Sequence, residues 1–326
     1  MRPGGLEPPT NSLEGCCSIH LSYGRATVLA RRTLRNLMLL CHQNHSRRSG
    51  SSGPRYGTLT FGRFMCAPGS AIRVLALLTV APLAVPRVVS AQTDEIQVYN
   101  GGLAPRGAFN LTLHNNFIAK GLTTPAFAGG LVPDQSLNGV PEWAYGVTAW
   151  FEAGLYFPLY SIGERSGHTS AMLNGVKVRM LFAVPRADER TLFYGVNFEL
   201  SYNAKHWDPT RITSEIRPII GWHLQPVDII LNPIFDTSYD GLENMDFAPA
   251  SRVACDLSRS WQLAIEEYAD FGPVHQFYSG NQQTHQLYGV VDHTTTALEI
   301  EAGVGFGLTA ASDKITLKLI LSRDLH

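Results

Sequence analysis

The sequence predicts an all-β fold: an antiparallel transmembrane β-barrel of about 12 strands, preceded by a disordered N-terminal extension. Three observations support this prediction. Strand-length segments alternate apolar and polar residues, and short connections alternate with long ones. Only 16% of the 326 residues are charged, against roughly 25% in an average soluble domain. The low charged fraction also excludes disorder throughout the chain and a coiled coil.

Charge divides the chain into two unlike parts. Residues 1–91 hold 11 Arg, no Lys and only two acids, Glu7 and Glu14, which gives a balance of +9. Residues 92–326 carry 15 Lys plus Arg and 25 acids, a balance of −10, so the net charge of −1 describes neither part. Four of the five cysteines lie in the first part and only Cys255 in the second. This distribution excludes a disulfide framework or a Cys-ligated zinc site within residues 92–326.

Residues 65–91 have the pattern of a secretory signal peptide. Arg73 precedes a short apolar run, and the small residues Val89 and Ala91 stand at −3 and −1 of a cleavage point. We therefore expect cleavage after Ala91 and translation from Met65. The alternative is a buried helix, which the acidic, polar stretch after the cleavage point disfavours.

Residues 1–64 are rich in Arg, Ser, Gly, Cys and Pro and show neither helical nor strand periodicity. Such a composition supports no core. We interpret this region as a disordered upstream extension that results from a mis-set start codon. The alternative is a basic arm that binds nucleic acid.

Residues 92–326 form the predicted barrel, and strict alternation is their main signal. In the segment 314–322, four apolar side chains share one face and three polar ones the other: Ile315, Leu317, Leu319 and Leu321 against Lys314, Thr316 and Lys318. We expect a short extra strand at 95–99. The twelve main strands are expected near 107–117, 141–150, 152–161, 171–184, 190–203, 210–223, 227–237, 247–257, 260–270, 284–293, 297–308 and 312–323.

The connections between these strands predict which kind of β-fold they build. Minimal gaps, as at Gln225-Pro226 and Ser258-Arg259, alternate with long ones, expected at 118–140, 162–170, 204–209, 238–246 and 271–283. Strands of 9–11 residues in even number, with tight turns at one end and loops at the other, are typical of transmembrane barrels. A soluble β-sandwich, whose strands alternate too, is the alternative.

If the apolar face contacts lipid, the polar face lines the lumen. We expect luminal side chains whose charges alternate between neighbouring strands, because an unpaired buried charge is costly. These candidates for a lumen or solute path are Lys177, Arg179, Glu199, Glu215, Arg217, Asp236, Arg252, Glu266, Glu299, Glu301, Lys314 and Lys318.

Two interpretations of these charges remain open. They form either a structural ladder of ion pairs or a charged pore or binding cavity. A twelve-stranded barrel is wide enough for both, because it exceeds the eight-stranded type that side chains fill completely. Gly303, Gly305 and Gly307 form one inward row. They either open a passage or leave room for the aromatic ring of a neighbour.

The sequence offers no convincing catalytic constellation, so we do not expect an enzyme. His168 and Ser170 with a distant acid form a weak hydrolytic set, which keeps an outer-leaflet lipid hydrolase as an alternative. The histidines show no metal-ligand spacing, and the body contains no phosphate loop, nucleotide fingerprint or nucleic-acid patch. We expect no metal, no cofactor and no nucleic-acid partner.

Three segments, 143–158, 215–221 and 305–318, resemble uncharacterised Gram-negative outer-membrane barrels. These barrels are similar to the transporters named for the MetA pathway of phenol degradation. The likeness covers roughly 95–323. Its most specific part lies within 305–318, where Gly-Leu-Thr, two small residues and Ser-Asp precede an alternating strand.

The resemblance implies an outer-membrane channel or transporter for small polar or amphipathic solutes, with no catalytic residue to carry over. A structural or ligand-binding barrel with a plugged lumen is the alternative. The expected partners are outer-membrane lipid, lipopolysaccharide, the barrel assembly machinery and an unidentified small solute.

Overall fold

The structure, a computed structural model, describes residues 95–325. The predicted upstream extension at 1–64 and signal peptide at 65–91 lie outside the described residues. Between 95 and 325, no helix is long and apolar enough to span a membrane. Two 3-10 helices, η1 (Ala187–Glu189) and η2 (Leu242–Asn244), accompany fourteen strands.

The strands follow one another along the chain as an antiparallel meander. Their bounds are β1 Phe109–Lys120, β2 Leu137–Gly146, β3 Phe151–Arg165, β4 His168–Ala183, β5 Leu192–Asn203, β6 Ile212–His223, β7 Val227–Asn232, β8 Phe235–Thr237, β9 Asp246–Phe247, β10 Ala250–Asp256, β11 Trp261–Asp270, β12 Thr284–Thr294, β13 Glu299–Gly307 and β14 Ile315–Leu325.

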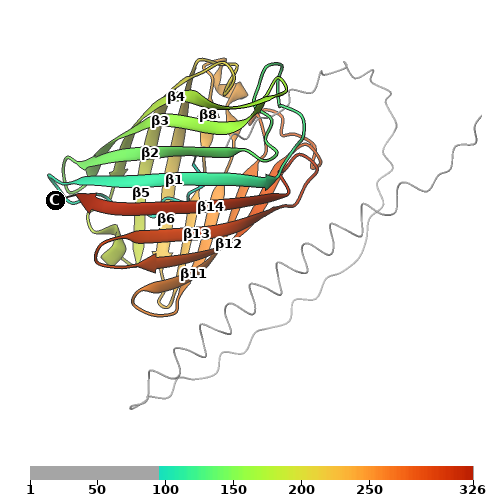
Figure 1. Cartoon of the computed structure of the whole chain (residues 1–326). Coiled ribbons are helices and arrows are strands. Elements are labelled where there is room, and N and C mark those ends of the chain that lie inside the picture. The colour runs from blue at the N-terminus through green and yellow to red at the C-terminus, as the bar shows by residue number, and fades with distance from the viewer. Residues whose placement is uncertain (1–94, 326) are drawn as a thin grey trace, which may run out of the picture.

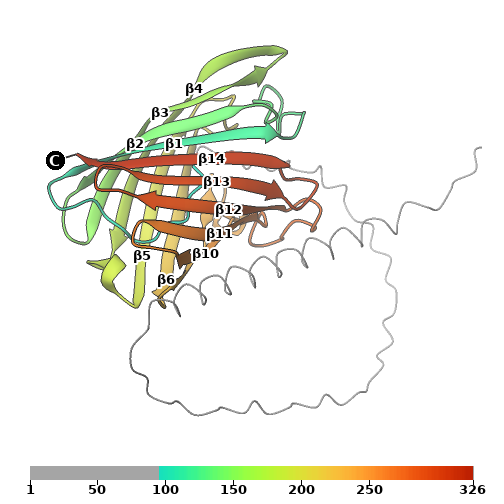
Figure 2. The same cartoon turned by 60° about the horizontal axis from the view of Figure 1, so that its bottom comes forward.

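The sheet closes on itself into a barrel (Figures 1 and 2). β1 pairs with β2 on one side and with β14 on the other, and β5 pairs with β6. β8 continues the line of β7, and β9 that of β10, so the wall has twelve strands. Closure removes the unpaired edges of the sheet, which lipid would leave without hydrogen-bond partners. The predicted twelve-stranded antiparallel barrel is confirmed.

The alternation of residues sorts into a polar inside and an apolar outside. In β14, Thr316 and Lys318 are 1% and 3% exposed, whereas Leu317 and Leu319 are 40% and 38% exposed. A soluble protein would bury these leucines. The outer wall therefore presents apolar side chains to its surroundings, and the polar row faces the lumen.

The two ends of the barrel differ. One end, the short-turn end, carries the connections 147–150, 184–191, 224–226, 257–260 and 295–298 together with the last residues of β14. The other end, the long-loop end, carries 121–136, 204–211, 238–245, 271–283 and 308–314. Exposed aromatic residues ring the outside of the short-turn end: Phe109, Tyr145, Trp150, Tyr194 and Trp261. Such a girdle is typical of a membrane–water interface.

Two predictions about local structure are wrong, one for a connection and one for a strand. The predicted loop at 162–170 is a tight hairpin, in which Ser166 and Gly167 have φ of 53° and 82°. Two consecutive residues of positive φ make the turn that suits the twist of paired strands. The predicted extra strand at 95–99 is not a strand. These residues, with their alternating polar and apolar side chains, belong instead to a segment that lies inside the barrel.

Three prolines form a row across neighbouring strands of the wall. The pairings Ile220↔Leu231 and Ile216↔Phe235 place Pro218 opposite Pro233, and the register between β7 and β10 places Pro249 next in the row. Ile234 accepts a hydrogen bond from Ala248 on the other side, so the backbone of Pro233 faces β6. Because neither Pro218 nor Pro233 has an N–H, both ladder hydrogen bonds are missing there. This is why β7 ends before β8 begins.

Candidate functional site: the lumen

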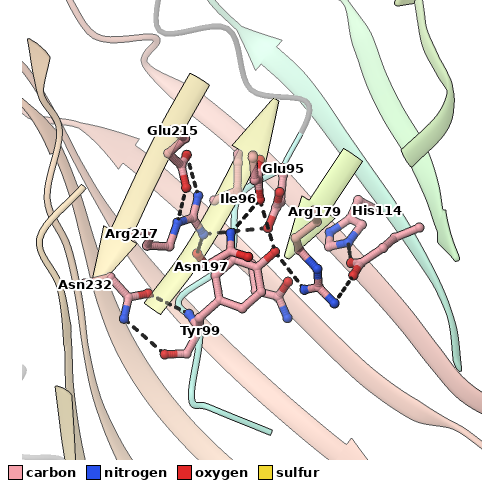
Figure 3. Close-up of polar contacts among 12 residues, drawn as sticks. Glu95, Ile96, Tyr99, His114, Arg179, Asn197, Glu215, Arg217 and Asn232 are labelled. Atoms are coloured by element: carbon pink, nitrogen blue, oxygen red, sulfur yellow. Dashed lines mark hydrogen bonds and ion pairs between the residues drawn. The ribbon is translucent and has the colours of Figure 1, made fainter. Parts of the chain in front are cut away.

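Residues 95–104 run through the lumen as an irregular segment, hereafter the luminal segment (Figure 3). Ile96, Val98 and Tyr99 are 3%, 6% and 5% exposed, which is core-like burial inside the barrel. Without a strand partner, the backbone groups of this segment must find other hydrogen bonds. Luminal side chains supply several of them.

Tyr99 is the most strongly held residue of the luminal segment. Its N–H donates to Oδ1 of Asn232 at 2.7 Å, and its carbonyl accepts from Nδ2 of the same side chain at 3.1 Å. Its hydroxyl lies 2.6 Å from that of Tyr156 and accepts from Nη1 of Arg179 at 3.1 Å. Burial raises the pKa of Tyr99 well above its ordinary value, so the hydroxyl stays protonated.

The first charged cluster surrounds this segment. Lys177 forms an ion pair with Glu199 at 2.9 Å, and Arg217 forms one with Glu215 at 2.6 Å. Glu95, from the luminal segment, lies between them, 3.8 Å from Nζ of Lys177 and 3.6 Å from Nη1 of Arg217. Burial raises the pKa of Glu95, and the neighbouring Glu199 raises it further, while Arg217 and Lys177 oppose the shift.

Arg179 joins the luminal segment to the wall. Its Nη2 lies 2.7 Å from Oε1 of Glu142 and forms a second ion pair with Glu152. Glu142 also bonds Nε2 of His114 at 3.1 Å, and Glu152 accepts from the N–H of Ala104. Figure 3 shows Arg179 reaching between the segment and His114.

The second charged cluster lies across β10 to β14. Nζ of Lys318 is 2.5 Å from both Oε2 of Glu266 and Oε1 of Glu301, and its side chain is fully buried. Arg252 forms ion pairs with Glu266 and Asp292 and lies 3.4 Å from Glu301. Two cations and three carboxylates therefore form one network, which satisfies charges that would be costly alone.

An apolar cluster seals the short-turn half of the lumen. Val98 and Tyr99 pack there against Leu181, Phe193, Ile219, Ile230 and Ile234, and Ala187 and Ala250 complete the cluster. Phe193 stacks on His223 with ring centroids 4.7 Å apart. The luminal segment is thus a plug, held by hydrogen bonds on one side and by apolar contacts on the other.

Above the plug, a cavity of about 710 Å³ opens toward the long-loop end. Glu95, Lys177 and Arg217 contribute to its lining together with residues of the long connections. Ligand pockets in proteins typically measure 300–1,000 Å³. The cavity is therefore large enough for a small organic molecule.

The structure brings nine of the twelve predicted luminal residues into the two clusters: Lys177, Arg179, Glu199, Glu215 and Arg217 in the first, and Arg252, Glu266, Glu301 and Lys318 in the second. Asp236 lines the cavity but forms no ion pair with another residue of the range 95–325. Glu299 begins β13 at the short-turn end and is exposed. Lys314 precedes β14, and its exposed side chain donates to the carbonyl of Thr309 at 2.5 Å. Lys314 therefore lies at the long-loop rim and belongs to neither charged cluster.

Gly305 lies on an inward row. Of the two predicted roles, opening a passage or leaving room for a neighbouring aromatic ring, the structure supports the second. A Cβ at Gly305 would lie 2.3 Å from the ring of Tyr288, which is fully buried. The missing side chain therefore leaves room for an aromatic ring and opens no passage. At Gly303 a Cβ would meet Val290 and Lys318.

Sequence reasoning missed several members of these clusters. The sequence predicts Glu95 and Tyr99 in a short strand and Glu152 at the start of another, and it does not single out Glu142, Glu152 or Asp292 as luminal. Glu142 and Asp292 do stand on the polar, inward row of β2 and β12, so strict alternation was the signal that could have found them. Nothing in the sequence marks residues 95–104 as luminal.

The weak hydrolytic set is not assembled. His168 and Ser170 lie at the start of β4 beside the hairpin turn and are exposed. Within residues 95–325, neither side chain bonds the other or an acid, and no group of three or more His, Cys, Asp or Glu could hold a metal ion.

Comparison with protein-family models and with curated proteins gives no match. Among solved structures, the chain is similar to an outer-membrane channel from Pseudomonas putida F1, with 14% identity and a TM-score of 0.49 over 71% of this chain and 100% of that one. It is also similar to the KdgM porin in complex with disordered oligogalacturonate (8% identity, TM-score 0.42, 67% and 99% covered). LpxR from Salmonella typhimurium follows with 7% identity, a TM-score of 0.36, and 66% and 99% covered. With TM-scores below 0.5, none of these similarities carries function over to this chain.

Proposed function

We propose that the chain is an outer-membrane β-barrel that acts as a channel for small polar or amphipathic solutes, and that the luminal segment closes it. A closed barrel with an apolar outer wall and an aromatic girdle fits a bilayer of the outer-membrane type. By the rule that periplasmic turns are short, the long loops face the cell exterior. Export by the signal peptide, with cleavage after Ala91, belongs to this proposal, as does the resemblance to transporters of the MetA pathway.

The observation that carries the proposal is the 710 Å³ cavity, which opens between the long loops and has the luminal segment as its floor. Solute that enters this cavity meets the plug around Tyr99. Release of the plug would join the cavity to the other half of the lumen. Because the plug is held by a few identifiable side chains, its release is open to test.

Planar-bilayer conductance of the full exported chain tests this function. We expect low conductance from the wild-type protein and a clear increase in variants that lose contacts to Tyr99. Heat-modifiable mobility on gels confirms that each variant is still a folded barrel. Zero conductance at all voltages, in wild-type and plug variants alike, would contradict a channel.

A ligand-binding barrel with a permanently plugged lumen is the second candidate. The extensive bonding of Tyr99 favours it, because a segment so well held need not move. Under this function the cavity binds a solute without passing it on. An outer-leaflet lipid hydrolase is the third candidate. Lipid profiles that stay unchanged after Ser170→Ala would count against it.

A further inference from the structure

The cavity has an excess of negative charge. Its lining includes nine acidic residues but only two basic ones, Lys177 and Arg217. These two cations are already paired with Glu95, Glu199 and Glu215. The remaining six acids are aspartates, and five of them form no ion pair with any described residue: Asp208, Asp236, Asp240, Asp270 and Asp313.

Cross-strand register places carboxylates directly opposite one another. Asp236 in β8 stands opposite Glu215 in β6 on one side and opposite Asp246 in β9 on the other. Directly opposed side chains of paired strands lie about 5 Å apart at Cβ, and like charges in such positions are destabilising. Arg217 neutralises Glu215, but no cation of the described chain forms an ion pair with Asp236.

Asp270 supplies an independent observation on the same wall. Its side chain is 8% exposed and lines the cavity. Oδ1 accepts the N–H of Gly272 at 2.8 Å, whereas Oδ2 has no hydrogen-bond or ion-pair partner among residues 95–325. Because Oδ2 is accessible from the cavity, a ligand there can supply the partner that the protein does not. An oxygen left open toward a cavity points to a ligand that donates hydrogen bonds.

The larger apolar side chains of the cavity gather on the opposite wall, although Asp208 also lies in one of its loops. This wall is built by β1, β3 and the loop at 121–136, across the barrel from β8, β9 and β11, together with the loop at 204–211, which joins β5 to β6. The side chains that form it are Ile118, Leu122, Phe127, Leu131, Leu159 and Trp207. A ligand that satisfies both walls has a cationic end and an apolar body, and an ammonium group is also attracted by aromatic faces.

From these observations we infer that the cavity binds an amphipathic organic cation, a protonated amine that places its ammonium against Asp236 and Asp270 and its apolar part against the wall around Leu131 and Trp207. The volume of about 710 Å³ suits an organic molecule. A bare metal ion fits less well, since no three described ligands are arranged to hold one. This inference names the solute class of the proposed function and rests on it.

Binding of three matched probes to the full exported protein in detergent tests the inference. The probes are benzylamine, which is protonated at pH 7, benzyl alcohol and benzoate, measured by isothermal titration calorimetry and by tryptophan fluorescence. We expect one site for benzylamine and about tenfold or more weaker binding of the other two. Equal or tighter binding of benzoate or benzyl alcohol would overturn the inference, as would binding of Ca²⁺ without binding of benzylamine.

The variant Asp236→Asn/Asp270→Asn assigns the site. It removes both charges with little change in volume, and we expect it to weaken benzylamine binding about tenfold or more. Asp188→Asn, in the exposed turn at the other end of the barrel, is the matched control and should bind like wild type. A folded double variant that binds benzylamine like wild type would also overturn the inference. If the double variant does not fold, the probe series on the wild-type protein still decides.

Conductance separates this inference from the proposed channel. Selective benzylamine binding without conductance would support the inference and contradict the channel. Conductance without any preference for benzylamine would contradict the inference and leave the channel standing.

Discussion

The hydroxyl of Tyr99, in the luminal segment, lies 2.6 Å from the hydroxyl of Tyr156, on the inner face of β3. Tyr156 is fully buried, so this contact is made deep in the lumen. One pair of phenols therefore links the segment that fills the barrel to the wall that encloses it. In the proposed channel, contacts of this kind keep the barrel closed.

Tyr99→Phe should loosen the plug while keeping its ring in the apolar cluster. The change removes the partner of the Tyr156 hydroxyl and of Arg179, which costs about 1–3 kcal/mol when the groups stay buried. We expect a higher open fraction in single-channel recordings. Tyr194→Phe, on the outer wall and 60% exposed, is the matched control and should leave the recordings unchanged.

Asn232→Ala should free the backbone of the luminal segment. The amide of Asn232 forms two hydrogen bonds with the backbone of Tyr99, and alanine forms neither. We expect faster amide hydrogen exchange in peptides from 95–104, by mass spectrometry. Asn244→Ala, in the half-buried end of η2 and away from the luminal segment, serves as control. Exchange equal to wild type would show that the apolar contacts alone hold the segment.

The double variant Pro218→Val/Pro233→Val should stabilise the barrel wall. Each new N–H would donate to the carbonyl of the opposite residue and complete the ladder between β6 and the segment after β7, each bond contributing about 0.5–1.5 kcal/mol. The readout is the temperature at which the folded band disappears from gels. Pro185→Val, in a turn outside the ladder, should not raise that temperature, and a double variant that melts below wild type would contradict the expected gain.

Lys318→Met should destabilise the barrel strongly. It leaves Glu266 and Glu301 facing each other with only Arg252 as cation, and breaking a buried pair from one side costs about 3–5 kcal/mol. The variant Lys318→Met/Glu266→Gln removes the orphaned charge as well and should recover part of this loss. Urea unfolding in lipid vesicles measures both. Additive effects of the two substitutions would show that Lys318 and Glu266 are not coupled.

The luminal segment should hold less firmly as pH rises. Burial raises the pKa of Glu95, so the docked segment favours the protonated form. Docking is therefore strongest below the ordinary pKa of glutamate, about 4.3, and weakens as pH rises through the raised value. Glu199, Lys177, Arg217 and His114 face the same carboxyl. Conductance that rises with pH in wild type, and less so in Glu95→Gln, is the expected result. A rise that is unchanged in Glu95→Gln would assign it to another group.

The sequence by itself determined the barrel. Alternation along segments such as 314–322 depends only on the two-residue period of a strand, so it placed Lys318 inside and Leu317 outside without knowledge of the partners. The same periodicity predicts the twelve strands. Their bounds need correction mainly at β2, which lies at Leu137–Gly146 instead of 141–150, and where β3 and β4 extend into a tight turn.

Only the tertiary structure decided which luminal charges meet and what fills the lumen. Lys318 pairs with Glu266, far away in the chain, because of strand tilt and register across the barrel, and periodicity within one strand carries no such information. Residues 95–104 carry the same kind of alternation as a strand, yet they lie in the lumen, because β1 finds its partners in β2 and β14 and leaves no edge for another strand.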